Sequence, residues 1–448
     1  METVDGVVVV GGGSVGLLTA LKLGKAGIRV VMLEAESGIT SVQQVVACMP
    51  TTTAVLDELG LLEDVRKSAV ICPEIAYRQG DGKLLAKLDW EVLAEDTQYP
   101  YMLLLGQNHV SSILVQHLRA LPNVDIRWNH RVENLDQDDA YVTLQISSPG
   151  GQTQLRSRWV AGTDGAQSTV REIVSPRFKG RTWPERMVAV NVFYDFSLYG
   201  YSRANFIHDP VDWAFIVQLD KSGLWRVCYE ENATLTTAQI RQRVSERLQQ
   251  LLPGAPTPDQ YRVEHVAPYK VSQRCVAERR LGRVILAGDA AQITNPIGGF
   301  GLSGGVLEAV DLGEALIAII NQNASDSVLD EYSDKRNQAF KDFISSGSTT
   351  FFAWMKENGR VQRKRDLAMF EKVQTDRAVM RQFLLEFEKM NGRRSRSISA
   401  HVSLVMYALK HQLNNIVKLT HQLTNLTMRS FRSLRFFRSR LSESISLE

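Results

Sequence analysis

Apolar and amphipathic stretches alternate along the first part of the chain. Residues 6–10 are almost entirely valine, residues 17–25 repeat apolar positions at helical spacing, and residues 28–33 form a second apolar run. Such apolar runs are typical of strands that are buried on both faces of a parallel sheet. Because the alternation continues to about residue 180, residues 1–180 are predicted to form an α/β arrangement.

The pattern changes between residues 183 and 275. The segments Met187–Tyr194, Trp213–Leu219 and Trp225–Tyr229 are short and rich in aromatic and β-branched residues, which is typical of strands. One helix, Thr237–Leu252, is predicted among them. We expect these strands to form a separate sheet.

The α/β character returns over residues 281–320, and the end of the chain is predicted to be helical. All 13 prolines lie at or before Pro296, and few glycines follow. A long stretch without these residues favours helix. We therefore expect the chain to divide into four regions. The third region completes the domain that the first begins, and the fourth is a helical extension. These regions are 1–180, 181–275, 276–345 and 346–448.

Composition narrows the class of protein. The chain has 448 residues, of which 44% are hydrophobic and 23% charged, as in an ordinary globular protein. The net charge of +3 is small and does not indicate nucleic-acid binding. The cysteines are far apart, which predicts neither a metal site nor disulfides. With no signal peptide and no apolar run of about 18 residues, the expected location is cytoplasmic. The cysteines are Cys48, Cys72, Cys228 and Cys275.

A glycine-rich turn follows the first apolar run. Gly11, Gly13 and Gly16 give the spacing G-x-G-x-x-G between a predicted strand and a predicted helix. In this context the glycines permit a tight turn, a close approach to a pyrophosphate, and close helix packing. Glu34, at the end of the next strand, is placed to accept ribose hydroxyls. The turn predicts a dinucleotide site but does not decide between NAD and FAD.

Two later segments favour FAD. Residues 160–171 read Val-Ala-Gly-Thr-Asp-Gly-Ala-Gln-Ser-Thr-Val-Arg and include Asp164, and residues 282–301 contain Gly288-Asp289 followed by a loop rich in glycine. An acid between a strand and a helix can accept hydrogen bonds from a polyol. A loop without bulky side chains lets a flat ring lie against its backbone.

The three motifs, in this order and about 150 and 125 residues apart, resemble those of the FAD-dependent aromatic hydroxylases. This is the flavin monooxygenase family typified by para-hydroxybenzoate hydroxylase. The resemblance covers roughly residues 5–345 and is greatest to fungal-type members of secondary metabolism. It implies a Rossmann-like FAD-binding domain (regions 1–180 and 276–345) with an inserted β-sheet substrate domain (region 181–275).

The resemblance also implies roles for individual residues. Asp289 would hold the ribityl chain, the loop containing Gly299 would lie along the isoalloxazine ring, and Leu302 would offer its backbone N–H to that ring. Gln107 would reach the ribityl–phosphate region, and the backbone of Val132 would meet adenine. In the family, the motif that contains Asp164 borders both FAD and the path of the reductant.

The implied reaction is insertion of one atom of molecular oxygen into a hydrophobic aromatic or polyketide-like substrate through a flavin C4a-hydroperoxide. The chain has no second strand–G-x-G-x-x-G–helix unit, so NADPH or NADH is expected to dock transiently. No catalytic base can be assigned, since Arg203, His208 and Tyr229 of the middle sheet are expected to be structural.

Some residues depart from the family pattern and leave alternatives open. Ser272 and Gln292 stand where family members have histidine, Gln43-Gln44 lacks a flavin-facing arginine, and Glu308 replaces an aspartate. One alternative is a flavin oxidase, a dehydrogenase or a redox-neutral flavoenzyme. Another is a flavin-bound interaction protein that uses its C-terminal helices.

The C-terminal tail is strongly basic. Residues 392–441 contain ten Lys or Arg residues and no Asp or Glu. Apolar positions recur there at steps of three, four or seven, which predicts a helix. Three readings stay open: packing on the rest of the chain, binding of a partner helix, and peripheral contact with an anionic membrane.

Overall fold

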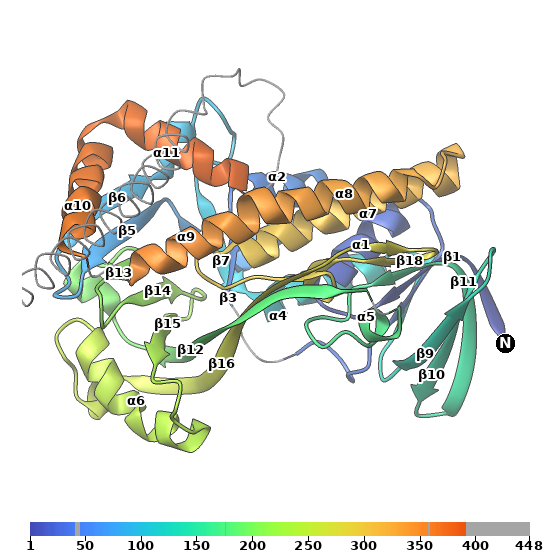
Figure 1. The fold of residues 1–448 in the computed structure, drawn as a ribbon, viewed down its shortest axis with the longest axis horizontal. Helices are drawn as coiled ribbons and strands as arrows, with labels where there is room; N and C mark the ends of the chain where they lie inside the picture. The colour runs from blue at the N-terminus through green and yellow to red at the C-terminus, as the bar shows by residue number, and fades with distance from the viewer. Residues whose placement is uncertain (41–44, 175, 357–358, 391–448) are drawn as a thin grey trace, which may run out of the picture. The chain divides into compact units, whose positions relative to one another are not determined.

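The computed structural model describes residues 1–390 apart from residues 41–44, 175 and 357–358 (Figure 1). A first sheet has a parallel core in the order β18-β11-β1-β2-β8. Strand β17 (Arg280–Leu281) extends its edge, and β9 and β10 continue it from β11 as antiparallel strands. The other strands are β1 (Glu2–Val10), β2 (Val30–Leu33), β8 (Val124–Arg127), β9 (Arg131–Gln137), β10 (Val142–Ser148), β11 (Gly151–Gly162) and β18 (Val284–Leu286).

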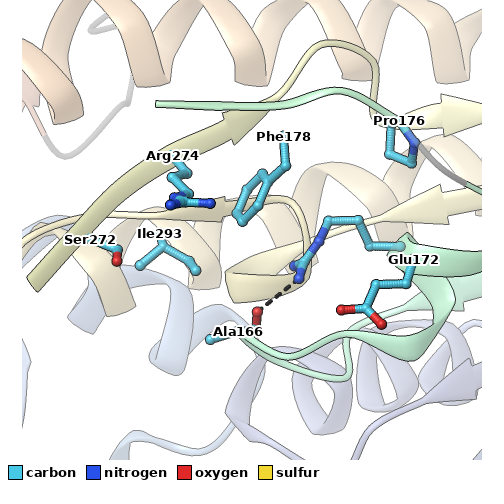
Figure 2. Close-up of a pocket in the computed structure, with 8 residues that line it drawn as sticks. Ala166, Glu172, Pro176, Phe178, Ser272, Arg274 and Ile293 are labelled. Carbon is cyan, nitrogen blue, oxygen red and sulfur yellow. Dashed lines mark hydrogen bonds between the residues drawn. The ribbon is translucent and has the colours of Figure 1, made fainter. Parts of the chain in front are cut away.

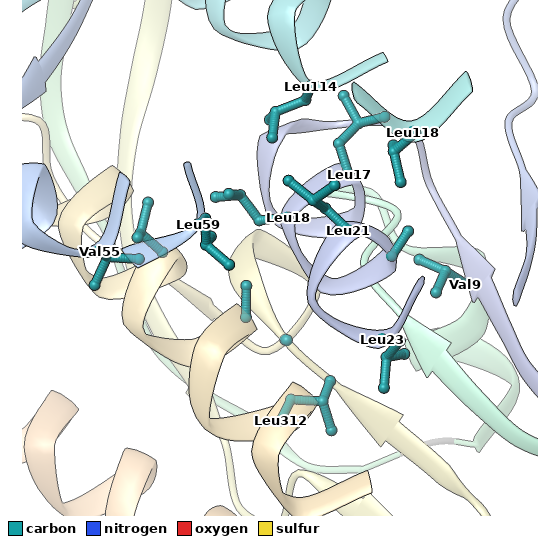
Figure 3. Close-up of a cluster of buried hydrophobic side chains, with 14 of the residues drawn as sticks. Val9, Leu17, Leu18, Leu21, Leu23, Val55, Leu59, Leu114, Leu118 and Leu312 are labelled. Carbon is teal, nitrogen blue, oxygen red and sulfur yellow. The ribbon is translucent and has the colours of Figure 1, made fainter. Parts of the chain in front are cut away.

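Helices α1 (Ser14–Lys25), α4 (Gln107–Arg119) and α7 (Phe300–Gln322) pack on this sheet. Their leucines and the valines of the sheet share one buried cluster, which is drawn in Figure 3. The predicted βαβ unit at the N-terminus is confirmed. Its apolar run is buried on both faces because helices cover one side and a second cluster around β9 and β10 covers the other.

The second sheet has the order β19-β16-β12-β15-β14-β13-β5-β6. The three strands and the helix expected from its sequence are present, and α6 (Thr237–Leu251) covers one face. The strands are β5 (Glu74–Gln79), β6 (Leu84–Asp89), β12 (Phe178–Phe193), β13 (Ala204–His208), β14 (Ala214–Gln218), β15 (Leu224–Glu231), β16 (Arg262–Val276) and β19 (Gln292–Ile293).

Strands β5 and β6 were not expected in this sheet. They precede the region 181–275, yet β5 pairs in parallel with β13, with Tyr77 opposite Phe206. Pairing over such a sequence distance leaves no local signal, because each strand alone reads as an ordinary hairpin strand. The face opposite α6 therefore combines residues from two distant parts of the chain.

The described part of the C-terminal third is helical, as the absence of proline predicted. Helix α8 (Val328–Ala339) continues through a π-helical turn (Phe340–Ser345) into α9 (Ser346–Met355), and Figure 1 shows α8 and α9 following one another. Helices α10 (Arg360–Thr375) and α11 (Arg377–Met390) then pack against β6. The basic tail, residues 392–441, lies outside the described residues.

The remaining elements connect these layers. A three-stranded sheet has the order β3-β7-β4, and three short α-helices and four short 3₁₀ segments lie among the described residues as well. Within that part, no helix is both long and apolar enough to cross a bilayer. These elements are β3 (Val45–Cys48), β4 (Val70–Cys72), β7 (Met102–Gly106), α2 (Pro50–Glu58), α3 (Leu62–Ser68) and α5 (Thr169–Val174).

Candidate active site

The three motifs of the sequence meet at one edge of the first sheet. Val10 at the end of β1 pairs with Gly162 of β11, and Gly162 pairs with Leu286 of β18. The residues that follow these three strands therefore emerge side by side. They include the glycine turn, Asp164 and Asp289, which lie far apart in the sequence. Crevices at the carboxyl ends of parallel strands are where α/β proteins bind ligands.

The glycine turn has the shape that a pyrophosphate needs. Gly11 has φ +106°, a conformation that side chains rarely adopt. A Cβ added to Gly16 would lie 2.0 Å from the carbonyl oxygen of Gly11, so the helix approaches the turn as closely as glycine permits. A Cβ on Gly13, in contrast, would meet nothing within 4 Å. The space beside Gly13 is open at the N-terminus of α1, where free N–H groups attract an anion.

Glu34 follows β2 directly and is held in place by the backbone. Its carboxylate accepts hydrogen bonds from the N–H of Gly12 and, at 2.8 Å, from the N–H of Glu36. A carboxylate oxygen has two lone pairs, so both oxygens can still accept a ribose hydroxyl. The geometry fits the role that the sequence predicted for Glu34.

Asp289 lies just after β18 in a short turn (Gly288–Ala290), where its own side chain is exposed and its two neighbours are buried. Burial raises the pKa of its carboxyl to about 6, the nearby charge of Glu308 adds to the rise, and Arg171 opposes it. Such a group binds most strongly to a ligand that donates hydrogen bonds to its carboxylate, as the hydroxyls of a ribityl chain do.

A buried ion pair supports the backbone beside Asp289. Arg279 Nη1 lies 2.8 Å from Glu308 Oε1, and the N–H of Gly288 donates to Glu308 Oε2 at 2.7 Å. Arg279 also donates to Gln292 Oε1 at 3.1 Å. Gln292 and Glu308, two of the departures from the family pattern, thus contact the same arginine. The sequence showed both departures but not that they belong to one network.

The flavin-facing loop expected at residues 296–301 ends at the start of α7. Gly298 and Gly299 have φ +92° and +71°, so this turn needs glycine. Leu302 lies in the first turn of α7, where backbone N–H groups have no partner inside the helix. A positive helix end here would favour electron density on a ring that lies against it.

The other predicted residues take different positions around the same edge. Asp164 accepts hydrogen bonds from Ser168 Oγ and, at 3.0 Å, from the N–H of Val170, so it also fixes the start of α5. Gln107 is the first residue of α4. Val132 lies on β9 with its side chain buried in the cluster beneath the sheet. Only backbone atoms of Val132 are therefore available to a ligand.

A cavity of about 550 Å³ opens beside the Asp164 motif (Figure 2). Arg171 lines it, stacks on Phe178 and donates to the carbonyl of Ala166 at 2.8 Å. Arg274 also lines the cavity and donates to Thr182 at 3.1 Å, while its Nε has no hydrogen-bond partner among the described residues. Its lining residues are Ala166, Arg171, Glu172, Pro176, Phe178, Ser272, Arg274 and Ile293.

The face of the second sheet opposite α6 is apolar and aromatic. One buried cluster joins this face to Ile297 and Phe300 of the flavin-facing loop and to α9, α10 and α11. Of the three residues considered for catalysis, Arg203 is exposed and Tyr229 is buried on the α6 side. His208 is buried, stacked on Trp354 at 4.8 Å, with Nε2 3.8 Å from Asp366.

Comparison with known protein families shows to which family the chain belongs. The family described as "FAD binding domain" matches residues 5–346. The chain belongs to this family. The match begins in β1 and ends at the start of α9, so it contains all three motifs and the whole second sheet.

Relatives with established names agree with this assignment. Para-nitrophenol 4-monooxygenase of Pseudomonas sp. (strain WBC-3) is 67% identical over 394 residues, which is 88% of this chain and 98% of that protein. 6-hydroxy-3-succinoylpyridine 3-monooxygenase HspB of Pseudomonas putida (strain DSM 28022 / S16) is 37% identical over 340 residues, covering 76% of this chain and 86% of that protein.

Solved structures show the same fold. The crystal structure of p-nitrophenol 4-monooxygenase PnpA from Pseudomonas putida DLL-E4 has a TM-score of 0.86 and 64% identity, covering 88% of this chain and all of that one. Aklavinone-11 hydroxylase, solved with FAD and aklavinone, has a TM-score of 0.71 and 26% identity, covering 80% and 70% of the two chains.

These findings confirm the predicted family, fold, cofactor and class of enzyme. The chain is an FAD-dependent monooxygenase of aromatic compounds, and its family uses NAD(P)H as reductant. Its named relatives are monooxygenases, which supports this reading over the oxidase and the interaction protein. The two curated relatives named here come from Pseudomonas, and a place in secondary metabolism stays a prediction.

Proposed function

We propose that the chain oxygenates para-nitrophenol, or a close nitrophenol, at the ring carbon that carries the nitro group. The observation that carries this proposal is the 67% identity to a para-nitrophenol 4-monooxygenase over 98% of that protein's length. At such identity, the apolar cluster between the flavin-facing loop and the second sheet is expected to keep its shape. A small, flat phenol suits a wall built from aromatic rings.

The atoms of this reaction balance without a further co-reactant. Oxygen joins the ring at the carbon para to the hydroxyl, the C–N bond breaks, and nitrite leaves with the bonding electron pair. The phenolic proton is lost, and the ring becomes benzoquinone. One oxygen atom ends in the quinone and the other in water, while NAD(P)H is oxidised to NAD(P)+.

We propose that the residues predicted from the sequence hold FAD. The glycine turn would bind the pyrophosphate, Glu34 the ribose, Asp289 the ribityl chain, and the start of α7 the flavin ring. When bound, FAD supplies hydride acceptance and oxygen activation. The protein supplies orientation and a wall that excludes water. The full set is Gly11, Gly13, Gly16, Glu34, Gln107, Val132, Asp164, Asp289, Gly299 and Leu302.

The cavity beside the Asp164 motif suits the transient reductant. Two arginines line it, and the phosphates of NADH or NADPH are anionic. Its opening lets a dinucleotide bind and leave without a domain of its own. On this proposal regions 1–180 and 276–345 bind FAD, and region 181–275 together with β5 and β6 forms the substrate wall. The described helices α9, α10 and α11 pack against that wall.

Substrate choice is tested by steady-state assays across a panel of phenols. Purified holoenzyme should consume NADPH or NADH and release nitrite with para-nitrophenol. Phenols that carry a hydroxyl or a methyl group at the para position should bind, as seen in the flavin spectrum, but give no nitrite. Rapid turnover of a hydroxypyridine with no turnover of any nitrophenol would contradict the proposal.

For the basic tail we propose peripheral contact with an anionic membrane, on the strength of its sequence alone. Each cation near such a surface adds about 1 kcal/mol. Full-length protein should sediment with anionic vesicles at low salt and be released at high salt, while a chain that ends near Gly392 should stay in the supernatant with its FAD. If the full chain ignores the vesicles, this part of the proposal is wrong.

A further inference from the structure

Gln273 of β16 lies between the start of α9 and the residues that lead into α7. Its side chain is 6% exposed. The amide Nε2 donates at 2.8 Å to the carbonyl oxygen of Ser345 and lies 2.8 Å from Ser345 Oγ and 3.1 Å from Thr349 Oγ1. Ser345 ends the π-helical turn, where the wider winding disturbs the regular pairing of backbone groups. Gln273 thus ties its strand to the end of this turn.

The other end of the same amide reaches Asn295, the residue directly before the flavin-facing loop. Gln273 Oε1 accepts a hydrogen bond from Asn295 Nδ2 at 3.1 Å, and Asn295 is completely buried. Asn295 Oδ1 in turn accepts from the N–H of Ile297 at 3.1 Å. A second link joins Thr294 Oγ1 to Ser348 Oγ at 3.0 Å. Two side-chain amides therefore connect the π-helical turn to the loop that leads into α7.

The far half of α9 contacts the aromatic face of the second sheet. The Phe352 ring lies 4.8 Å from Trp183 and 5.6 Å from Trp213, and Phe351 lies 5.5 Å from Phe206. Phe352 is only four residues from Ser348, a rise of about 6 Å along a helix. The first turn of α9 thus contacts Thr294, just before the flavin-facing loop, and its second turn contacts the aromatic face of the second sheet.

We propose that Gln273 and Asn295 are positioning residues that hold the flavin-facing loop in register with α9, and through α9 with the aromatic wall. Neither residue is assigned to touch the reacting atoms. Through these two residues, the position of the flavin-facing loop depends on how α9 packs against the aromatic face of the second sheet. This dependence keeps NAD(P)H oxidation coupled to oxygenation of a bound aromatic substrate. The proposal rests on the proposed function for its substrate but not for its geometry.

Bond directionality explains why these two side chains are needed. The Gln273 amide must donate toward Ser345 and accept from Asn295, and the Asn295 amide must donate to Gln273 and accept from Ile297. Each side chain satisfies both neighbours in one orientation only. Because Gln273 and Asn295 are both buried, breaking the bond between them leaves unpaired polar groups, which costs more than the bond itself contributes.

Two variants break the path in different places. Gln273→Met keeps the length of the side chain and removes both contacts. Asn295→Asp keeps the acceptor for the N–H of Ile297 and replaces the donor to Gln273 by an acceptor. Thr350→Ala is the matched control, because Thr350 lies on the exposed side of α9 and only donates to Ser346 O at 2.9 Å.

The first readout needs no substrate. Holoprotein of each variant is compared by visible circular dichroism of the bound flavin and by iodide quenching of its fluorescence. Both network variants should retain FAD yet change the flavin signal and its accessibility, while Thr350→Ala matches the wild type. Unchanged flavin signals in both network variants would overturn the proposal. If Gln273→Met loses FAD, Asn295→Asp alone decides.

The second readout is the ratio of product to NADPH consumed. With para-nitrophenol this ratio should fall on the order of ten-fold in the network variants, with hydrogen peroxide making up the difference, since small misplacements of reacting groups reduce rates steeply. A ratio equal to that of the wild type would contradict the coupling. If the wild type turns over no phenol, the proposed function fails while the flavin signals still test the positioning role.

Discussion

Arg279 Nη1 and Glu308 Oε1 lie 2.8 Å apart, and their side chains are 0% and 1% exposed. Glu308 reaches Arg279 with one carboxylate oxygen and accepts from the N–H of Gly288 with the other. The pair therefore fixes the backbone of the residue before Asp289. Because the pair is buried, its loss should measurably lower the free energy of unfolding.

Removing one partner of this pair should destabilise the protein strongly. Glu308→Ala leaves the buried guanidinium of Arg279 without its counter-ion, which costs about 3–5 kcal/mol. Urea unfolding followed by circular dichroism measures the difference in the free energy of unfolding. Glu314→Ala is the control on the same helix, because its exposed ion pair with Lys22 contributes at most about 1 kcal/mol. Equal losses for the two variants would show that burial of the pair is unimportant.

The affinity for FAD should depend on pH through Asp289. The pKa of this carboxyl is raised to about 6 by burial and by Glu308, and is lowered in part by Arg171. FAD is expected to bind the carboxylate form, so the dissociation constant should be constant above about pH 6 and should rise as the pH falls through that value. Titration of the apoprotein with FAD between pH 5 and pH 8 measures this.

Asp289→Asn serves as the control for this dependence. It should bind FAD about one to two decades more weakly at pH 8, because a charge-assisted hydrogen bond contributes roughly 1.5–3 kcal/mol. Its affinity should not vary through pH 6. A wild-type affinity that is the same at pH 5 and pH 8 would argue against Asp289 as the ribityl-binding group.

Replacement of Gly13 and replacement of Gly16 should have different consequences. Gly13 has φ −73° and open space around its Cβ position. Gly13→Val should therefore fold as apoprotein with nearly wild-type stability and bind no FAD, because the new side chain takes the place of the pyrophosphate. Gly16→Val should lose the fold itself, since a Cβ there would overlap Gly11 O. Flavin content and thermal unfolding distinguish the two outcomes. A yellow Gly13→Val protein would contradict the assignment.

Binding of the reductant NADPH should depend on Arg274. Arg274→Gln removes a cation from the cavity beside the Asp164 motif and should raise the KM for NADPH with FAD content and kcat little changed. This pattern is expected when a residue contributes to binding but not to the transition state. Arg158→Gln is the control, because Arg158 is an exposed arginine of β11 paired with Asp5 at 3.6 Å. A lower kcat with unchanged KM would place the reductant elsewhere.

Local motifs were readable from the sequence, and contacts between distant segments were not. The turn at Gly11–Gly16 and the loop before α7 require glycine for backbone reasons, so their positions carry the information. The placement of β5 beside β13 depends on pairing across more than a hundred residues. The contact of Gln292 and Glu308 through Arg279 likewise exists only in the folded chain.

The substrate wall was the least predictable part. His208 and Tyr229 lie on neighbouring parts of one sheet, yet the first faces the C-terminal helices and the second faces α6. Strand periodicity separates the two faces but does not say which one a cofactor approaches. That choice is made by α9 and the flavin-facing loop, whose packing together depends on Gln273 and Asn295.

Oxygen isotope labelling shows directly whether the chain inserts an atom of molecular oxygen into a nitrophenol. Holoenzyme is supplied with para-nitrophenol and NADPH under ¹⁸O₂, and the product is reduced to hydroquinone as it forms and is analysed by mass spectrometry. We expect one ¹⁸O atom in each product molecule, together with unlabelled nitrite in amounts equal to the product. Consumption of NADPH that yields only hydrogen peroxide, with no labelled product from any phenol, would contradict it.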